Sequence, residues 1–375
     1  MNALSGITIV ETAERVCGEW AGRLLADFGA EVIKLERPGG SPTRRYGPHV
    51  DGKGAVFAYC NTNKKSVVVD LEGETGRDTL EKLLERADAL IDDHDPQWCA
   101  RVGLDPAALR ERHLRLVHCQ ITPFGQQAPD DHHRAWPINV AAAGGWAWHT
   151  PSESDDADPP LMGAGRFMPD FESGLDAAIA IAASLLRQRR MGQGQCIDLS
   201  EVAVQISRAD VVLGRVLAGD DEPSHSRRRY DMGGPGDVFA CADGFVHLVM
   251  MTSAQWQGLK DIMGNPDWAE EFPQDWLEFH CTPDRVTSFR DQFRPWIALQ
   301  KRNEVSKAAQ AKGVPLVPGN SAEDLLANEQ YRHRGYFQSL EGLAYPTAAY
   351  RMTASPVRLN RTAPAPDADR DEVFP

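Results

Sequence analysis

The sequence predicts an α/β protein whose large domain is built around a mainly parallel sheet with helices on both faces. In the N-terminal third, short β-branched runs alternate with helical patterns, which is typical of parallel sheets. The 375 residues are enough for one large domain that carries a smaller one. A composition with 42% hydrophobic and 25% charged residues excludes collagen, coiled coil and global disorder.

Each element follows from its local pattern. Strands are expected where β-branched and apolar residues cluster, over residues 7–10, 31–35, 66–71, 89–91, 115–121 and 196–199. Helices are expected where apolar residues recur at helical spacing, over residues 19–28, 75–86, 171–190 and 200–217. Neither GxGxxG nor GxxxxGK[ST] follows the first strand, so the fold is Rossmann-like without the phosphate-binding turn of a dinucleotide-binding or P-loop protein.

Composition divides the chain into four parts. Residues 1–220 hold the first part of the large domain. Residues 221–236 (DEPSHSRRRYDMGGPG) form a linker. Residues 237–312 combine a hairpin pattern, DVFACADGFVHLVMM, with tryptophan-bearing helical segments, which predicts a smaller α+β domain. Residues 313–375 return to the large domain, and their end, from residue 363, is expected to be a disordered tail.

Charge and cysteine usage exclude several classes of function. The formal net charge of −14 argues against a nucleic-acid binder, because phosphate binding needs a basic face. The seven cysteines are dispersed without zinc spacing, which indicates reduced thiols, a cytoplasmic location and no metal. No apolar run is long enough to cross a membrane. The pair His132-His133 is interpreted as part of a solvated loop, since neighbouring side chains point to opposite sides.

Asp170 is the first residue with a chemical interpretation. It lies between a glycine-rich loop and the longest helical pattern, where a carboxylate can be a helix N-cap or a nucleophile facing a cleft. Five cations lie at or after the ends of expected strands, where open α/β sheets bind ligands. Together they suggest a pocket for a phosphorylated ligand: Arg37, Lys64, Lys65, Arg101 and Arg134.

The order of several motifs then identifies a family. The segments RLLADFGAEVIKLERPGG, NTNKKSVVVDL, ARVGLD and above all DFESGLDAAIAIAASLLRQRRMGQGQCIDLS, followed by CADGFVHLV and GVPLVP, resemble the family III CoA-transferases. This group includes carnitine CoA-transferases and formyl-CoA transferases. The resemblance extends from Leu4 to about residue 366.

The resemblance implies a fold, a reaction and an assembly. The large Rossmann-like domain would be built from both chain ends with the small domain inserted, and two chains would interlock as a homodimer. The substrates would be an acyl-CoA, a carboxylic acid and coenzyme A itself. Asp170 matches the family's nucleophile, which passes the acyl group through an aspartyl anhydride and an aspartyl-CoA thioester.

The resemblance also carries CoA-binding residues over to this sequence. Val16 corresponds to the loop at the thioester end and Val69 to the segment near the adenine. The remaining matches are basic: Arg37, His94, Arg101 and Arg134. Two of these matches depart from the family, because His94 follows Asp93 where Glu-Asn-Phe is usual and Arg134 replaces a lysine.

Two alternative functions stay open. An α-methylacyl-CoA racemase shares the fold but needs a histidine where this chain has Trp136, and an indole cannot exchange protons. A catalytically silent CoA-binding subunit would use Asp170 only as a helix cap. For a transferase, the aromatic residues around the expected cleft suggest a medium-sized or hydrophobic acyl group: Trp136, Trp146, Trp148 and Phe171.

Overall fold

The computed structural model describes residues 2–50, 52–146, 166–208, 214, 217–219 and 234–375. Contacts between residues divide the chain into two units. The first contains the described residues of 1–150, 158–223 and 333–375, so it is built from both ends of the chain, and the second contains those of 224–332. In the described part of the chain, no helix has both the length and the apolar character needed to cross a membrane.

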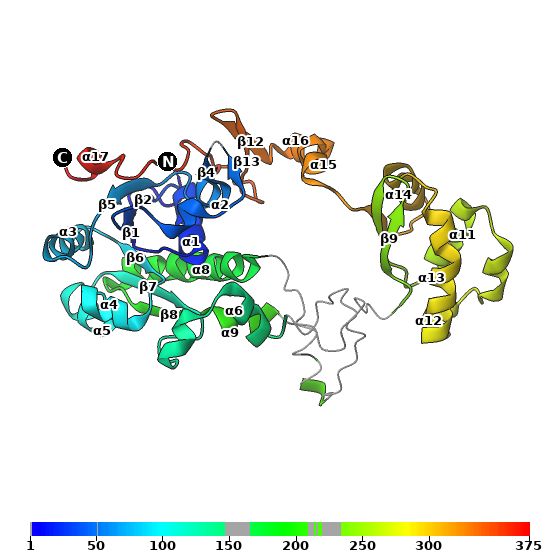
Figure 1. Cartoon of the computed structure of the whole chain (residues 1–375), viewed down its shortest axis with the longest axis horizontal. Coiled ribbons are helices and arrows are strands. Elements are labelled where there is room, and N and C mark those ends of the chain that lie inside the picture. The colour runs from blue at the N-terminus through cyan, green and yellow to red at the C-terminus, as the bar shows by residue number, and fades with distance from the viewer. Residues whose placement is uncertain (1, 51, 147–165, 209–213, 215–216, 220–233) are drawn as a thin grey trace. The chain divides into compact units, whose positions relative to one another are not determined.

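A six-stranded parallel sheet is the centre of the first unit (Figure 1). Its strands lie in the order β5-β2-β1-β6-β7-β8. Their bounds are β1 (Thr8–Glu11), β2 (Glu31–Glu36), β5 (Lys65–Val68), β6 (Ala89–Asp92), β7 (Val117–Thr122) and β8 (Cys196–Ser200). Ile9 on β1 pairs with Val32 of β2 on one side and with Ala89 of β6 on the other. The direction of winding therefore reverses between β1 and β6, which creates a crevice at their carboxyl ends.

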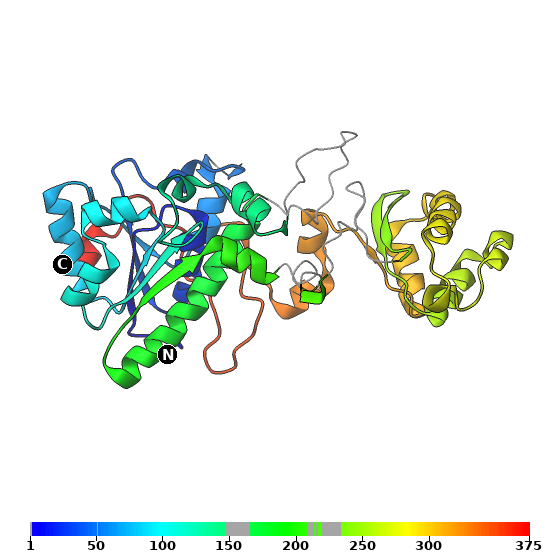
Figure 2. The ribbon, with the colours of Figure 1, turned by 90° about the horizontal axis from the view of Figure 1, so that it is seen from below.

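Alternate side chains of the strands enter two separate cores, one on each face of the sheet. Ile9 and Val32 pack with α1 (Val16–Asp27) and α8 (Met168–Met191), the long helix that crosses one face in Figure 2. Val10 and Ile33 pack on the other face. The helices of that face are α3 (Glu74–Leu84), α4 (Pro96–Val102) and α5 (Pro106–Arg112). Burial on both faces explains why the strands read as continuous apolar runs rather than as alternating patterns.

The approach of α8 to α1 depends on Gly174. A Cβ atom on this residue would lie 2.4 Å from the main-chain oxygen of Cys17 and 3.0 Å from the Trp20 ring. Only glycine leaves room for such a close approach. Because α8 also contains Asp170 and α1 follows directly after Arg15, this contact fixes the distance between two parts of the crevice.

Several short elements complete the first unit. They are η1 (Pro42–Arg45), β3 (His49–Val50), β4 (Lys53–Gly54), α2 (Ala55–Cys60), η2 (Asp130–Arg134), α6 (Pro137–Ala143), α9 (Glu201–Arg208), β12 (Phe337–Leu340), β13 (Leu343–Pro346) and α17 (Arg370–Val373). The helix expected over residues 200–217 is described as α9 over its first part, and most of the remainder lies outside the described residues.

The end of the chain is ordered, contrary to the expected disordered tail. The edge strand β5 donates its free main-chain N–H groups to it: Ser66 N to Asp369 Oδ2 at 2.9 Å and Val68 N to Asp367 Oδ1 at 2.8 Å. Val373 is buried in the core with the helices of that face. The polar and charged composition of the segment predicts a disordered tail, but its carboxylates accept hydrogen bonds from the main-chain N–H groups of the edge strand.

The second unit has a three-stranded antiparallel sheet and its own aromatic core. The strands are β9 (Asp237–Cys241), β10 (Gly244–Leu248) and β11 (Leu316–Pro318), in the order β11-β10-β9. Its helical segments are α11 (Ser253–Met263), η3 (Asp267–Glu271), α12 (Trp276–Phe279), α13 (Pro283–Ile297), α14 (Arg302–Ala311), α15 (Ala322–Ala327) and α16 (Glu329–Arg334). Trp256, Trp276 and Phe289 are fully buried together. The expected hairpin over residues 237–251 is present as β9 and β10.

Candidate active site

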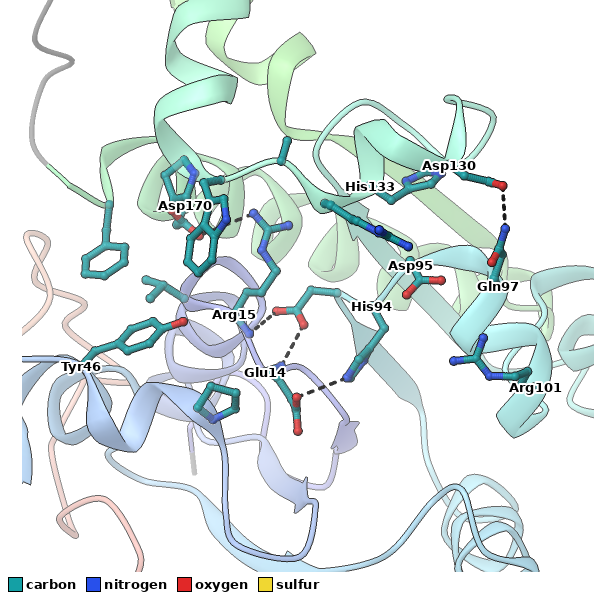
Figure 3. A pocket seen from close by; sticks show the side chains of 18 residues that line it. Glu14, Arg15, Tyr46, His94, Asp95, Gln97, Arg101, Asp130, His133 and Asp170 are labelled. Carbon is teal, nitrogen blue, oxygen red and sulfur yellow. Dashed lines mark hydrogen bonds and ion pairs between the residues drawn. The ribbon is translucent and has the colours of Figure 1, made fainter.

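A cavity of about 590 Å³ lies in the first unit, where the loops after β1 and β6 meet the start of α8 (Figure 3). This is the crevice at the reversal of strand order, the place where open α/β sheets bind ligands. Five residues that the sequence analysis assigned to the site line this cavity: Val16, His94, Arg101, Arg134 and Asp170. The geometry therefore brings together side chains from four separate segments of the chain.

A second cavity, of about 390 Å³, contains the other two assigned residues. Arg37 and Val69 line it, together with the apolar Leu35 and Leu71. Glu14 and His94 belong to the linings of both cavities. The two cavities therefore adjoin, and together they suit an extended ligand with one end near Asp170 and the other near Val69.

Asp170 is the third residue of α8 and not its N-cap. The helix begins at Met168, the cap position is Phe167, and Pro169 lies in the first turn, where a missing N–H costs no hydrogen bond. The capping interpretation of Asp170 is therefore wrong. Its carboxylate is 2% exposed, and the buried Oδ2 has no hydrogen-bond partner among the described residues. A buried carboxylate oxygen without a partner is unusual in folded proteins and needs an explanation.

Three acidic residues lie near Arg15, which lines the cavity. Arg15 Nη1 lies 2.5 Å from Glu201 Oε1, and Arg15 Nη2 lies 3.9 Å from Asp170 Oδ1 (Figure 3 shows the contact with Asp170). The third acid, Asp93, accepts the main-chain N–H groups of Glu14 at 2.8 Å and Arg15 at 2.9 Å. Burial and the neighbouring acids favour the protonated form of each carboxyl group, whereas the Arg15 cation favours the ionised form.

The pKa of Asp170 is raised to about 8. Burial is the main cause, the negative charge of Glu201 adds to it, and Arg15 partly opposes both by favouring the carboxylate. Burial likewise raises the pKa of Asp93 to about 6, although His94 and Arg15 lower it. Asp170 thus exchanges its proton near neutral pH, where an ordinary aspartate is already fully ionised.

Cys17 completes this cluster without forming a convincing metal site. Its sulfur and one carboxylate oxygen from each of Asp170 and Glu201 lie within 4.8 Å of one another. Metal binding would need the thiolate, but burial and then the charge of Glu201 raise the pKa of this thiol well above its usual value. Arg15 already compensates the carboxylates. The chemistry of this donor set therefore favours an acid–base site.

Two cations of the expected phosphate pocket have structural roles instead. Lys64 is fully buried and donates to Glu11 at 2.7 Å and to Asn61 at 2.8 Å, so it cannot reach a ligand. Lys65 is paired with Glu31 and Glu372. The other three remain at the two cavities: Arg37, Arg101 and Arg134 are exposed, and Arg37 contacts Glu14 at 3.3 Å.

The aromatic residues expected at the acyl pocket have different positions. Trp136 lines the main cavity and is 63% exposed. Phe171 packs against Trp20 and Tyr59, with ring centroids 5.3 Å and 6.3 Å apart. Trp146 follows α6, and Trp148 lies outside the described residues. Tyr46 and Phe167 form a stacked pair in the cavity lining, with centroids 5.8 Å apart.

Arg15 and Glu201 are site residues that sequence reasoning missed. Each lies just after the carboxyl end of a strand, Arg15 after β1 and Glu201 directly after β8. That position is the signal that identifies ligand-binding loops in parallel sheets.

Comparison with known proteins agrees with this arrangement. The sequence pattern of the family described as CoA-transferase family III matches residues 4–370. A succinate–glutarate CoA-transferase of Agrobacterium fabrum is 30% identical, over 96% of this chain and 92% of that protein. The BbsE subunit of the succinyl-CoA:(R)-benzylsuccinate CoA-transferase of Thauera aromatica is 27% identical, over 92% of this chain and 88% of its own length.

A solved structure has the same fold over the full length. The crystal structure of a CAIB/BAIF family protein from Brucella suis superposes with a TM-score of 0.87, covers 100% of both chains and is 25% identical. The parallel sheet, the two units and the sequence pattern therefore agree on one assignment. The chain belongs to CoA-transferase family III.

Proposed function

We propose that this protein moves CoA from an acyl-CoA to a carboxylic acid, with Asp170 as the nucleophile. One observation carries the proposal: Asp170 is buried at the end of the 590 Å³ cavity with an unpaired Oδ2. A carboxylate suits this reaction because its acyl adduct stays activated, so the free energy of the thioester is retained. Burial also keeps water away from the adduct.

The first half of the reaction consumes the donor. The ionised Asp170 attacks the thioester carbonyl, the C–S bond breaks, and CoA leaves as a thiolate with a mixed anhydride on Asp170. The thiolate then attacks the Asp170 acyl carbon. This step forms an aspartyl-CoA thioester and releases the donor acid as its carboxylate.

The second half repeats these steps with the acceptor. The acceptor carboxylate attacks the aspartyl-CoA thioester and expels the thiolate, which leaves an anhydride between Asp170 and the acceptor. The thiolate attacks the acceptor's acyl carbon, so the new acyl-CoA departs and Asp170 returns to its carboxylate. No proton or electron is lost or gained over the cycle.

The two adjoining cavities supply the binding roles. We assign Val69 to the adenine end, and Val16, at the start of α1, to the thioester end of CoA. The phosphates would be bound by the cations of both linings: Arg37, His94, Arg101 and Arg134. The scheme assigns no role to a metal ion.

For the exchanged acids we propose short dicarboxylates. The relatives above are named for succinate, glutarate and benzylsuccinate, and the cavity around Asp170 offers His133 to a second carboxylate and Trp136 to an apolar group. A panel of succinyl-, acetyl- and hexanoyl-CoA with matching acids tests this choice. Preference for hexanoyl-CoA would instead support the hydrophobic acyl group expected from the aromatic residues.

We also propose that the protein is a homodimer. Leu175, Ile179 and Leu186 lie on one side of α8 and are 43%, 60% and 51% exposed. A second copy of the chain is the partner that the family resemblance suggests for this apolar surface. Light scattering coupled to size-exclusion chromatography measures the mass directly, and the mass of a monomer would contradict the proposal.

Trapping the adduct tests the nucleophile. The protein is incubated with each acyl-CoA and then with hydroxylamine, and the modified peptide is located by mass spectrometry. We expect a hydroxamate at Asp170 and none in Asp170→Asn. Acid–base exchange at the α-carbon without any adduct would favour the racemase, and CoA binding with neither reaction would favour a silent CoA-binding subunit.

A further inference from the structure

Glu201 is a buried carboxylate that the proposed reaction does not use. It is the first residue of α9, it is fully buried, and it follows directly after β8. Its Oε1 lies 2.5 Å from Arg15 Nη1. Arg15 comes from the loop after β1, and its side chain is 25% exposed. The pair therefore joins two segments that are distant in sequence, next to Asp170.

The guanidinium of Arg15 faces two acids with two different nitrogens. Nη1 contacts Glu201, and Nη2 lies 3.9 Å from Asp170 Oδ1. Among the described residues, Arg15 is the cation that forms an ion pair with Asp170. The planar fork of arginine permits this double contact, whereas the point charge of a lysine does not.

We propose that Glu201 is a positioning residue that anchors Arg15 by one nitrogen and so keeps its other nitrogen directed at Asp170. This inference rests on the proposed function of Asp170 as nucleophile. Whenever Asp170 is acylated it carries no charge, and Arg15 would then lose its partner there. Glu201 still contacts the guanidinium through Nη1, so the cation is neither left unpaired nor drawn toward the CoA phosphates.

Other charged and titratable groups face Asp170 from the elements around it. Cys17 is on α1, Asp93 follows β6, Tyr46 follows η1, and Cys60 ends α2. Of these, Asp93 adds a negative charge, while the thiols and the phenol are neutral near pH 7 because burial raises the pKa of each. Glu201 is the acid that both repels Asp170 electrostatically and holds its counter-charge.

Two substitutions separate these effects. Glu201→Gln removes the charge but keeps a side-chain oxygen that can contact the Arg15 guanidinium. Glu201→Leu removes both the charge and the anchor. The matched control is Glu36→Gln, because Glu36 is also a fully buried carboxylate that accepts two bonds from an arginine, Arg44, at 2.7 Å and 2.6 Å.

The measurement is the rate of hydroxylamine-trapped adduct formation at Asp170, in single turnovers from pH 5 to 10, with succinyl-CoA or the donor that labels the wild type. We expect Glu201→Gln to slow the plateau rate less than about threefold and to shift the acid limb to lower pH. We expect Glu201→Leu to slow the plateau about tenfold or more while the Kd for CoA changes little. Glu36→Gln should leave the acid limb in place.

Several outcomes would overturn the inference. A folded Glu201→Leu with the wild-type plateau rate would show that no anchor is needed, and equal losses in both variants without a pH shift would indicate a purely structural role. If Glu201→Leu does not fold, Arg15→Lys provides the same test, because it keeps the charge but cannot face both acids; a wild-type rate would then contradict the anchor. Absence of any adduct in the wild type would instead contradict the proposed nucleophile.

Discussion

The imidazole ring of His94 lies on the indole of Trp98, with centroids 3.7 Å apart and planes inclined by 16°. His94 Nδ1 also contacts Asp92 Oδ2 at 2.9 Å. Burial alone would lower the pKa of His94, but Asp92 and then Glu14 raise it to about 10. The ring is therefore an imidazolium at neutral pH, stacked on an indole and bound at its edge by a carboxylate, at the junction of the two cavities.

Substitution of His94 should weaken CoA binding more than it slows the chemistry. His94→Gln removes the cation, and a charge-assisted contact to a phosphate contributes roughly 1.5–3 kcal/mol. We expect the Kd for CoA, measured by calorimetry at pH 7.5, to rise about tenfold or more. Trp98→Phe keeps an aromatic surface under the ring and should change Kd less than about threefold. An unchanged Kd in His94→Gln would exclude His94 from the CoA site.

Asp170→Asn should stabilise the protein increasingly as the pH rises. The pKa of Asp170 is higher in the folded protein than in the unfolded chain, so wild-type stability is full below about pH 4 and is lost as the pH rises through about 8. Asparagine does not titrate and avoids this loss. We expect the Tm of Asp170→Asn minus that of the wild type to grow by several degrees between pH 5 and 8 and then to level off.

For Glu36→Gln we expect the opposite pH dependence of the Tm difference between the variant and the wild type. Burial opposes ionisation of Glu36, but the hydrogen bonds from Arg44 and the charge of Lys34 lower its pKa to about 2. Its contribution to stability is present above the unfolded pKa and is lost in acid. The Tm of Glu36→Gln should therefore fall furthest below that of the wild type at neutral and alkaline pH. Parallel Tm curves for the two variants would contradict both assignments.

Arg37 and Arg101 should act on binding rather than on turnover. Each is exposed at one of the cavities, where a partly hydrated contact to a phosphate is screened by salt. We expect Arg37→Gln and Arg101→Gln to raise the KM for acyl-CoA about threefold to tenfold at low ionic strength, with kcat within about twofold. Arg112→Gln is the control, because Arg112 is exposed on α5 and pairs with Glu81. A comparable rise in that control would reveal a general charge effect.

Gly174→Ala should damage stability and catalysis together. The added methyl group would meet the Cys17 oxygen at 2.4 Å, so α8 must move away from α1 and take Asp170 with it. Such overpacking costs roughly 1–3 kcal/mol of unfolding free energy. We expect a lower midpoint in urea and a fall in kcat. Gly234→Ala, whose methyl group would approach the Met250 oxygen no closer than 3.7 Å, should show neither effect.

The sequence predicted those features that depend on neighbouring residues. Residues 31–35 read as a strand because the apolar residues Val32, Ile33 and Leu35 pack on one face of the sheet or the other, and the observed β2 is only one residue longer. The motifs that follow Asp170 predict its place at the start of the long helix, but they do not predict that the helix already begins at Met168, because Pro169 is compatible with the first turn as well as with a preceding loop.

Long-range partners could not be predicted in the same way. The contact of Arg15 with Glu201 depends on the register of β1, β6, β7 and β8, which places two loops from distant parts of the sequence at one edge. Lys64 likewise looked like a surface cation, and only the packing of α1 against β1 and β2 encloses it with Glu11. Whether a charged side chain faces a ligand or a buried partner is decided by such packing.

Asp367 and Asp369 have a consequence for the behaviour of the protein in concentrated solution. Strand β5 ends the sheet, and its two outward N–H groups would otherwise be available to a strand of another molecule. The two carboxylates accept hydrogen bonds from these N–H groups and place negative charge along the free edge of β5. Proteolytic removal of residues 367–375 would therefore convert a protected sheet edge into a nucleus for aggregation, even though every residue of the cavity would remain.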